Sequence, residues 1–198
     1  MSYEMKTRRF WRSQLPHWEV ERGYYFITIR CAGSLPRTVV EQIKEVYASM
    51  KAIEPNDGAY EALQRRYFQT VEKYTDTSKG FCPFRTKECA DVITEKLLEL
   101  DAVGWHVPHY AIMPNHIHFV AKVDIDSEDM HTVLSRWKGG TSHQGNSILK
   151  RSGAFWQRDW FDRVVRCDSE MERTVAYIQQ NPVKGGLCKH WQNYKYVR

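Results

Sequence analysis

The sequence predicts an α+β fold in which one antiparallel sheet carries helices mainly on one face. Two observations support this class. Short segments rich in aromatic and β-branched residues, which are typical of strands, alternate with longer segments in which apolar residues recur every three or four positions, as in amphipathic helices. In addition, two strand segments are separated only by Pro114 and Asn115. So short a connection favours a hairpin and therefore antiparallel pairing.

The first part of the chain contains a predicted strand and a predicted helix. Residues 24–30 are aromatic and β-branched and end before a turn sequence, which predicts a strand. The apolar spacing over residues 37–50 predicts an amphipathic helix. Residues 52–84 follow as an irregular excursion with some helix over about 59–74, and their role cannot be inferred from the residues.

The middle of the chain contains the predicted hairpin. Thr86 is a candidate N-cap for a helix that ends at about Leu100. Strands are then predicted over residues 104–113 and 116–123, on either side of the Pro-Asn connection.

The later part of the chain adds a helix and a strand. Ser127 is a candidate N-cap for a helix that we expect to be interrupted at Gly139-Gly140, to resume and to end near residues 151–153. Residues 161–166 are predicted to form the fourth strand.

Length and composition are those of a single globular domain over residues 1–198. The chain has 198 residues, of which 42% are hydrophobic and 27% charged, and it is too short for an eightfold barrel of about 250 residues. The sequence has neither an apolar run of membrane-spanning length nor a signal-peptide pattern, so we expect a cytoplasmic protein with no membrane partner. The five cysteines are scattered, as expected of reduced structural thiols.

Positive charge is concentrated at the two ends of the chain, which we interpret as basic tails. The formal net charge is +5, and residues 131–198 contain 12 Lys and Arg against 5 acidic residues. A second basic segment, around Arg8 and Arg9, lies near the N-terminus. Aromatic residues are interleaved with these cations, and this combination attracts a phosphate backbone with stackable bases. On composition alone, a merely solvated basic surface is the alternative.

The sharpest single motif is the pair of histidines in the third predicted strand. His116 and His118 are two residues apart, so on a strand both side chains point to the same face while Ile117 points to the other. Two imidazoles on one face can bind one metal ion. The alternative is a chance spacing. His106 and His109 are three apart, so at most one of them could join such a site.

The last predicted helix presents a phenol and an amide together. We expect Asp168 or Ser169 to cap it and Pro182 to end it. Tyr177 and Asn181 are four residues apart and therefore lie on the same flank of the helix. The alternative is a tyrosine at the margin of the core and an asparagine at a helix end. Because Asn181 precedes a proline, its backbone is biased away from the helical region.

These two motifs together resemble those of a known family. The segment at 113–119, MPNHIHF, and the segment at 177–187, YIQQNPVKGGL, resemble the REP-associated tyrosine transposases, which are related to single-tyrosine insertion-sequence transposases. The resemblance extends over nearly all of residues 15–190. A glycine at position 185 replaces the alanine that is usual in the family, outside the expected site.

The resemblance implies a fold and an activity. It implies a ferredoxin-like nuclease core of the His-hydrophobic-His (HUH) class, and a metal-dependent endonuclease and strand transferase that acts on single-stranded DNA bearing a hairpin of the repetitive extragenic palindrome type. Tyr177 matches the nucleophile, which would form a 5′-phosphotyrosine. His116, His118 and Asn181 match the ligands of a divalent ion, Mg²⁺ or Mn²⁺, with bound zinc as the alternative.

Further residues are candidates for DNA contacts through their charge or aromatic faces. They are Arg8, Arg9, Trp137, Lys138, Trp156, Arg158, Arg163, Arg166 and Lys184. Asp162 is a candidate to orient a ligand histidine, or else to pair with an arginine.

Two other functions remain as alternatives. One is a DNA-hairpin-binding protein without catalysis. The other, which ranks last, is a zinc hydrolase in which a His-x-His motif ends a strand of a barrel much longer than this chain. The residues do not decide between a monomer and a homodimer.

Overall fold

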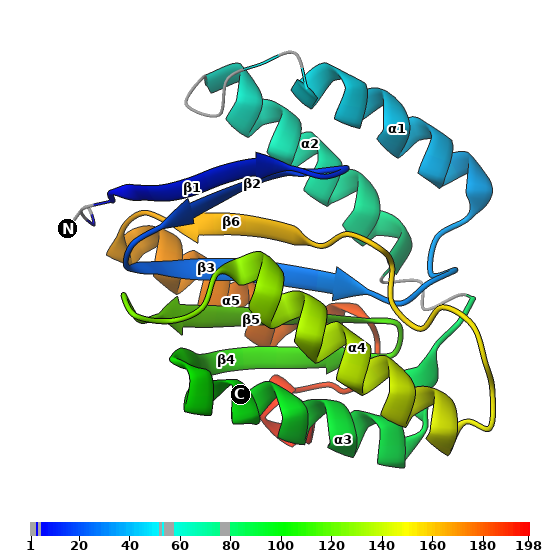
Figure 1. The fold of residues 1–198 in the computed structure, drawn as a ribbon. Coiled ribbons are helices and arrows are strands. Elements are labelled where there is room, and N and C mark those ends of the chain that lie inside the picture. Colours follow the sequence, from blue (N-terminus) through cyan, green and yellow to red (C-terminus); the bar gives the residue numbers. More distant parts are fainter. Residues whose placement is uncertain (1–2, 4, 52, 54–57, 76–79) are drawn as a thin grey trace.

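The computed structural model describes residues 3, 5–51, 53, 58–75 and 80–198, and it confirms the α+β class with an antiparallel sheet (Figure 1). Within these residues the main sheet has four strands in the order β4-β5-β3-β6. The strand bounds are Gly23–Arg30 for β3, Trp105–Met113 for β4, His116–Val123 for β5 and Phe161–Val165 for β6. All three strand pairs are antiparallel, and the β4-β5 hairpin is confirmed.

The main helices are close to those predicted. They are α1 at Arg37–Lys51, α2 at Gly58–Thr75, α3 at Lys87–Leu98, α4 at Met130–Ile148 and α5 at Asp168–Lys184. Short 3₁₀ helices lie at Pro83–Arg85, Glu99–Val103 and Trp191–Asn193. Within the described part of the chain, no helix combines the length and the apolar character that crossing a membrane requires.

Helices cover both faces of the sheet rather than mainly one. Figure 1 shows α3 and α4 in front of the sheet and α5 behind it. The central strand β3 contributes to both cores: Tyr25, Ile27 and Ile29 join the core under α3 and α4, whereas Phe26 joins a second core with α1, α2 and α5. A strand buried on both faces loses the alternation of apolar and polar residues that would indicate a one-sided sheet.

Several predicted helix boundaries differ from the structure, and one is the start of α5, whose N-cap is Cys167 rather than Asp168 or Ser169. The N-cap of α4 is Asp129, whose side chain accepts a hydrogen bond from the Thr132 amide, and the helix continues without a break through Gly139 and Gly140. Helix α5 includes Pro182 and ends two residues later, so Asn181 keeps a helical position. In both helices the packing of the apolar face outweighs a local residue preference.

The described residues near each end of the chain pair with neighbouring strands, which the sequence did not predict. The basic N-terminal segment forms strand β1, Thr7–Arg12, which pairs with β2, Pro16–Val20, in a separate two-stranded sheet next to β6 (Figure 1). The C-terminal segment runs along β4, where Arg198 and Tyr110 exchange backbone hydrogen bonds. Neither basic segment is therefore a loose tail in the residues that the structure describes.

Candidate metal and nucleophile site

The two strand histidines lie together on one face of the sheet. His116 and His118 are both fully buried on β5, and their ring centroids are 4.6 Å apart. Ile117, between them, points into the opposite core, as the strand period requires. Helix α2 adds the carboxylate of Glu72, and the ligand atoms of Glu72, His116 and His118 all lie within 4.8 Å of one another.

Hydrogen bonds fix the orientation of both imidazoles. Nδ1 of His118 lies 2.8 Å from the hydroxyl of Thr28, which is its direct neighbour on β3. Nδ1 of His116 donates to the side-chain oxygen of Asn115 at 2.7 Å. Nε2 of His118 lies 3.5 Å from Oε1 of Glu72, and Nε2 of His116 has no hydrogen-bond partner among the described residues. Such outer contacts set the direction of a ligand histidine in metal sites.

Tyr177 joins the same group from α5. Its hydroxyl donates a hydrogen bond to Glu72 and lies 3.5 Å from Nε2 of His118. Its ring makes edge contacts with Phe26 and Phe68, with centroids 5.7 and 5.5 Å away. The Nζ atom of Lys184 lies 5.0 Å from the centre of the Tyr177 ring. The phenol is thus held between an aromatic wall and the His-Glu group, all within one chain.

The protonation states of the group suit metal binding. Burial and, next, the neighbouring His118 lower the pKa of His116 to about 3, so this imidazole is neutral. Burial alone would raise the pKa of Glu72, but His118 and the hydrogen bond from Tyr177 lower it to about 2, so the carboxylate is ionised. Neutral imidazole and ionised carboxylate are the forms that bind a cation.

Several buried polar atoms of this group have no hydrogen-bond partner among the described residues. They are Nε2 of His116, both side-chain atoms of Asn181 and Oε1 of Glu72, which does make an ion-pair contact of 3.5 Å with Nε2 of His118. Asn181 is fully buried and acts on the pKa of His116, so it lies beside that imidazole. Leaving buried polar atoms unpaired is costly, and a bound ion would satisfy them. The donor set of two imidazoles and a carboxylate fits a divalent metal ion.

Glu72 was missed by the sequence analysis. It lies in the excursion at 52–84, which has neither a recognisable motif nor a spacing that relates it to the histidines. The only signal would have been an acidic residue among the apolar positions of a helix, where Val71 is buried beside it. That pattern is too common to indicate a site by itself.

Three residues predicted to contact DNA lie in the interior instead. Trp137 and Trp156 are 7% and 6% exposed, and their ring centroids are 5.5 Å apart in the core under α3 and α4. Lys138 is also buried, and its ammonium group donates to the backbone carbonyl of Arg158 at 2.6 Å. The core covers the faces that a base or phosphate would need, and DNA binding by these three side chains stays a prediction.

The remaining predicted DNA contacts are reachable from solvent. Arg8, Arg9, Arg158 and Lys184 are exposed. Arg163 and Arg166 are half-buried: Arg163 forms an ion pair with Glu170, and Arg166 lies over the Trp18 ring. Their binding of DNA stays a prediction.

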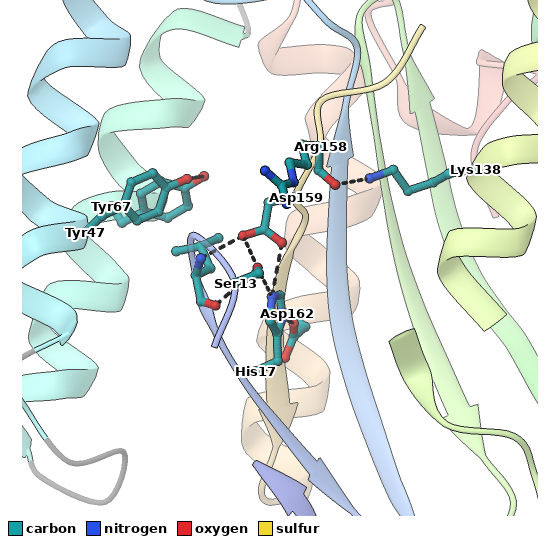
Figure 2. Close-up of polar contacts among 9 residues, drawn as sticks. Ser13, His17, Tyr47, Tyr67, Lys138, Arg158, Asp159 and Asp162 are labelled. Atoms are coloured by element: carbon teal, nitrogen blue, oxygen red, sulfur yellow. Dashed lines mark hydrogen bonds and ion pairs between the residues drawn. The ribbon is translucent and has the colours of Figure 1, made fainter. Parts of the chain in front are cut away.

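Asp162 contacts a different histidine from the one expected. It hydrogen-bonds Nδ1 of His17, while Asp159 lies 3.1 Å from Nε2 of the same ring. Figure 2 shows these residues together with Ser13, whose hydroxyl donates to Asp159 at 2.6 Å. We call Ser13, His17, Asp159 and Asp162 the His17 cluster. Along β6, Asp162 points away from the face that holds His116 and His118, so it cannot orient them.

The His17 cluster joins two segments that carry exposed cations. His17 belongs to β2, whereas Asp159 lies just before β6 and Asp162 lies within it. The backbone amide of Leu15 also donates to Asp159, at 2.7 Å. The basic strand β1, which pairs with β2, is thereby fixed relative to the segment that carries Arg158.

The His17 cluster predicts a pH dependence of stability. Burial alone would lower the pKa of His17, but Asp162 and Asp159 raise it to about 9. An unfolded histidine has a pKa of about 6.5, so the imidazolium contributes about 3 kcal/mol, fully present below pH 6.5 and lost as the pH rises through 9. Lys138 acts in the opposite direction, because burial lowers its pKa to about 8. The buried ammonium group of Lys138 therefore destabilises the folded state at low pH, and this destabilisation is lost as the pH rises from about 8 to about 10.5.

The effect of His17 on stability can be separated from that of Lys138 by comparing the wild type with His17→Gln. Both proteins contain Lys138, so the difference between them reports on His17. Urea unfolding at about pH 6 and about pH 9.5 should show that the wild type loses about 3 kcal/mol relative to the variant between these values. An equal difference between the two proteins at both pH values would show that His17 is not charged in the folded state.

A solved structure of a known protein shares this fold. A REP-associated tyrosine transposase, solved bound to a REP hairpin, aligns with a TM-score of 0.56 and 13% identity, over 94% of this chain and 82% of that chain. A candidate transposase from Deinococcus radiodurans R1 aligns with a TM-score of 0.35 and 11% identity, over 81% of this chain and 91% of that chain. A scan of protein-family models and a search of curated proteins find no match. The predicted resemblance is confirmed at the level of the fold.

Proposed function

We propose that this chain is a metal-dependent endonuclease and strand transferase that cleaves hairpin-bearing single-stranded DNA through Tyr177. One observation carries the proposal: the Tyr177 hydroxyl adjoins two histidines and a carboxylate that can hold a divalent ion. A phenol packed against a metal site is suited to nucleophilic attack on a phosphodiester. The shared fold with a transposase that binds a REP hairpin supports this reading.

The residues that would hold the ion are His116, His118 and Glu72, with Asn181 beside them. The bound ion would neutralise the oxygens of the scissile phosphate and orient it. The site offers both nitrogen and oxygen ligands, which favours Mn²⁺. Mg²⁺ ranks second because it prefers oxygen ligands and two of the ligands here are imidazole nitrogens. A permanently bound Zn²⁺ is the alternative.

The chain's own residues would perform the cleavage. The Tyr177 oxygen forms a bond to phosphorus, the bond from phosphorus to the 3′ oxygen breaks, and that oxygen leaves as a 3′-hydroxyl after taking up a proton. Glu72, which accepts the hydrogen bond of the phenol, aims its oxygen. Lys184, next to the Tyr177 ring, adds positive charge where a phosphate would approach.

The phosphotyrosine link would keep the energy of the broken bond. Attack by another 3′-hydroxyl on the same phosphorus would release Tyr177 and join two DNA ends, without any further energy source. Since Tyr177 and both histidines meet within one chain, we infer that a monomer can assemble the site. Exposed Arg8, Arg9 and Arg158 would hold the DNA backbone.

A cleavage assay tests this function. Labelled single-stranded hairpins from the DNA that flanks the protein's gene are incubated with the protein and Mn²⁺ or Mg²⁺, and the products are separated on denaturing gels. Metal-dependent cleavage at one position beside a hairpin is the expected result. Tight binding of a hairpin without cleavage in either metal would favour the non-catalytic binding protein instead.

Glu72→Gln is expected to weaken metal binding because it removes the only carboxylate among the described ligands while keeping the shape of the side chain. Titration with Mn²⁺ in a calorimeter should give a dissociation constant about 10- to 100-fold higher than that of the wild type. The matched control is Glu45→Gln, an exposed glutamate on α1. Equal Mn²⁺ affinity in wild type and Glu72→Gln would remove Glu72 from the site.

A further inference from the structure

A groove between α2 and α5 leads to the His-Glu group from the outside. It encloses about 320 Å³ and opens over the β6 edge of the sheet. Its lining includes Arg65 and Phe68 from α2, Arg173 and Tyr177 from α5, and Phe161 and Arg163 from β6. We propose that this groove is a subsite for one nucleotide of the single-stranded DNA, directly beside the scissile phosphate. The inference rests on the proposed function and specifies where its substrate lies.

The inner end of the groove is the candidate nucleophile. On α2, Phe68 is one helical turn before Glu72, and on α5, Arg173 is one turn before Tyr177. Along both helices, the groove therefore leads toward the hydrogen bond between Tyr177 and Glu72. A phosphate placed at the Tyr177 oxygen would leave its neighbouring nucleotide in the groove.

The inner wall of the groove is aromatic. The Phe68 ring, which is partly exposed, lies 5.1 Å from Phe161, 5.4 Å from Phe26 and 5.5 Å from Tyr177, between ring centroids. A rigid group of rings with one partly open face is the arrangement on which single-stranded DNA bases stack.

The outer part of the groove is positively charged. Arg65 and Arg173 are exposed on the two walls, and Arg163 on the floor forms an ion pair with Glu170. Three guanidinium groups against one carboxylate attract an anion. The ligand that suits this groove thus has a flat π face and a phosphate, which describes a nucleotide. The volume is near the lower end of the range of about 300–1,000 Å³ for ligand sites, so we expect a single nucleotide rather than a duplex stem.

Binding in the non-cleaving Tyr177→Phe protein tests the subsite. The probes are the flanked hairpins used for the cleavage assay, with each single-stranded base in turn replaced by an abasic residue, in the presence of Mn²⁺. At one position beside the cleavage site, loss of the base should weaken binding about tenfold. Adding Phe68→Leu should reduce that effect to within about twofold, because the stacking surface is gone. The matched control is Phe81→Leu, a partly buried phenylalanine that packs on Phe155 in the other core.

Arg65→Gln provides a second measurement that does not disturb the aromatic packing. It should lower the slope of log affinity against log salt by about one, whereas Arg37→Gln, an exposed arginine on α1, should not. An abasic effect that is unchanged by Phe68→Leu, or a salt slope that is unchanged by Arg65→Gln, overturns the subsite while the proposed function stands. If the parent protein binds none of the hairpins, the proposed function itself fails.

Discussion

Tyr177→Phe is expected to abolish DNA cleavage, with a single-turnover rate at least about 10⁴-fold below that of the wild type. The substitution removes only the hydroxyl that adjoins Glu72 and His118. The ring contacts with Phe26 and Phe68 remain available to phenylalanine, so the fold and the groove should be kept. Rates are measured on labelled hairpins with protein in excess, so that product release does not limit the reaction.

A matched tyrosine variant shows whether the effect is specific. Tyr194→Phe removes a hydroxyl that donates to the backbone of Ile112, away from the His-Glu group, and should cleave at close to the wild-type rate. Hairpin affinity should also be similar in the wild type and in Tyr177→Phe, because binding depends on the basic and aromatic surface rather than on the nucleophile. Cleavage by Tyr177→Phe at an undiminished rate would mean that another group attacks the phosphate.

Replacing both strand histidines is expected to eliminate the metal site. In His116→Gln/His118→Gln the two imidazole nitrogens that face Glu72 are lost, so Mn²⁺ affinity should fall at least about 100-fold and cleavage should become undetectable. Metal binding also stabilises a protein: Mn²⁺ at 100 times its dissociation constant adds about 2.7 kcal/mol and should raise the wild-type Tm by about 5–10 °C. The double variant should show no such rise.

The control for the double variant is His106→Gln. His106 is exposed on β4 and pairs with Asp101 and Asp124, outside the candidate site. It should keep the Mn²⁺-dependent rise in Tm. A rise of the same size in the double variant would mean that the ion binds elsewhere in the chain, and the assignment of the histidines to the metal would be wrong.

The shared face of the histidine pair was predictable from a local period, whereas Tyr177 was singled out through the family resemblance. His116 and His118 are two residues apart on a strand, so their side chains point to the same face. This can be inferred without knowing any tertiary contact. Glu72 was not predictable, because α2 reaches the histidines only through packing on the sheet. The direction of a helix that follows an irregular segment cannot be inferred from its own residues.

The tryptophans show a second limit of reasoning from sequence. Trp137 and Trp156 lie among cations in the sequence, which is typical of a nucleic-acid surface, yet both rings are in the core. Sequence neighbours on a helix face different directions, so proximity of charge along the chain does not show that an indole is exposed. The end of α5 shows the same limit. Proline usually ends a helix, but α5 continues through Pro182 to Lys184 because its packing outweighs this preference.

The most direct test of the account is the mass of the protein after reaction with DNA. The wild type is incubated with a hairpin substrate and Mn²⁺, digested with nuclease and protease, and examined for a peptide that carries a nucleotide. One modified peptide is expected, with the 5′-phosphate attached to the Tyr177 oxygen. Cleaved DNA with no covalent adduct, or an adduct on any residue other than Tyr177, would contradict it.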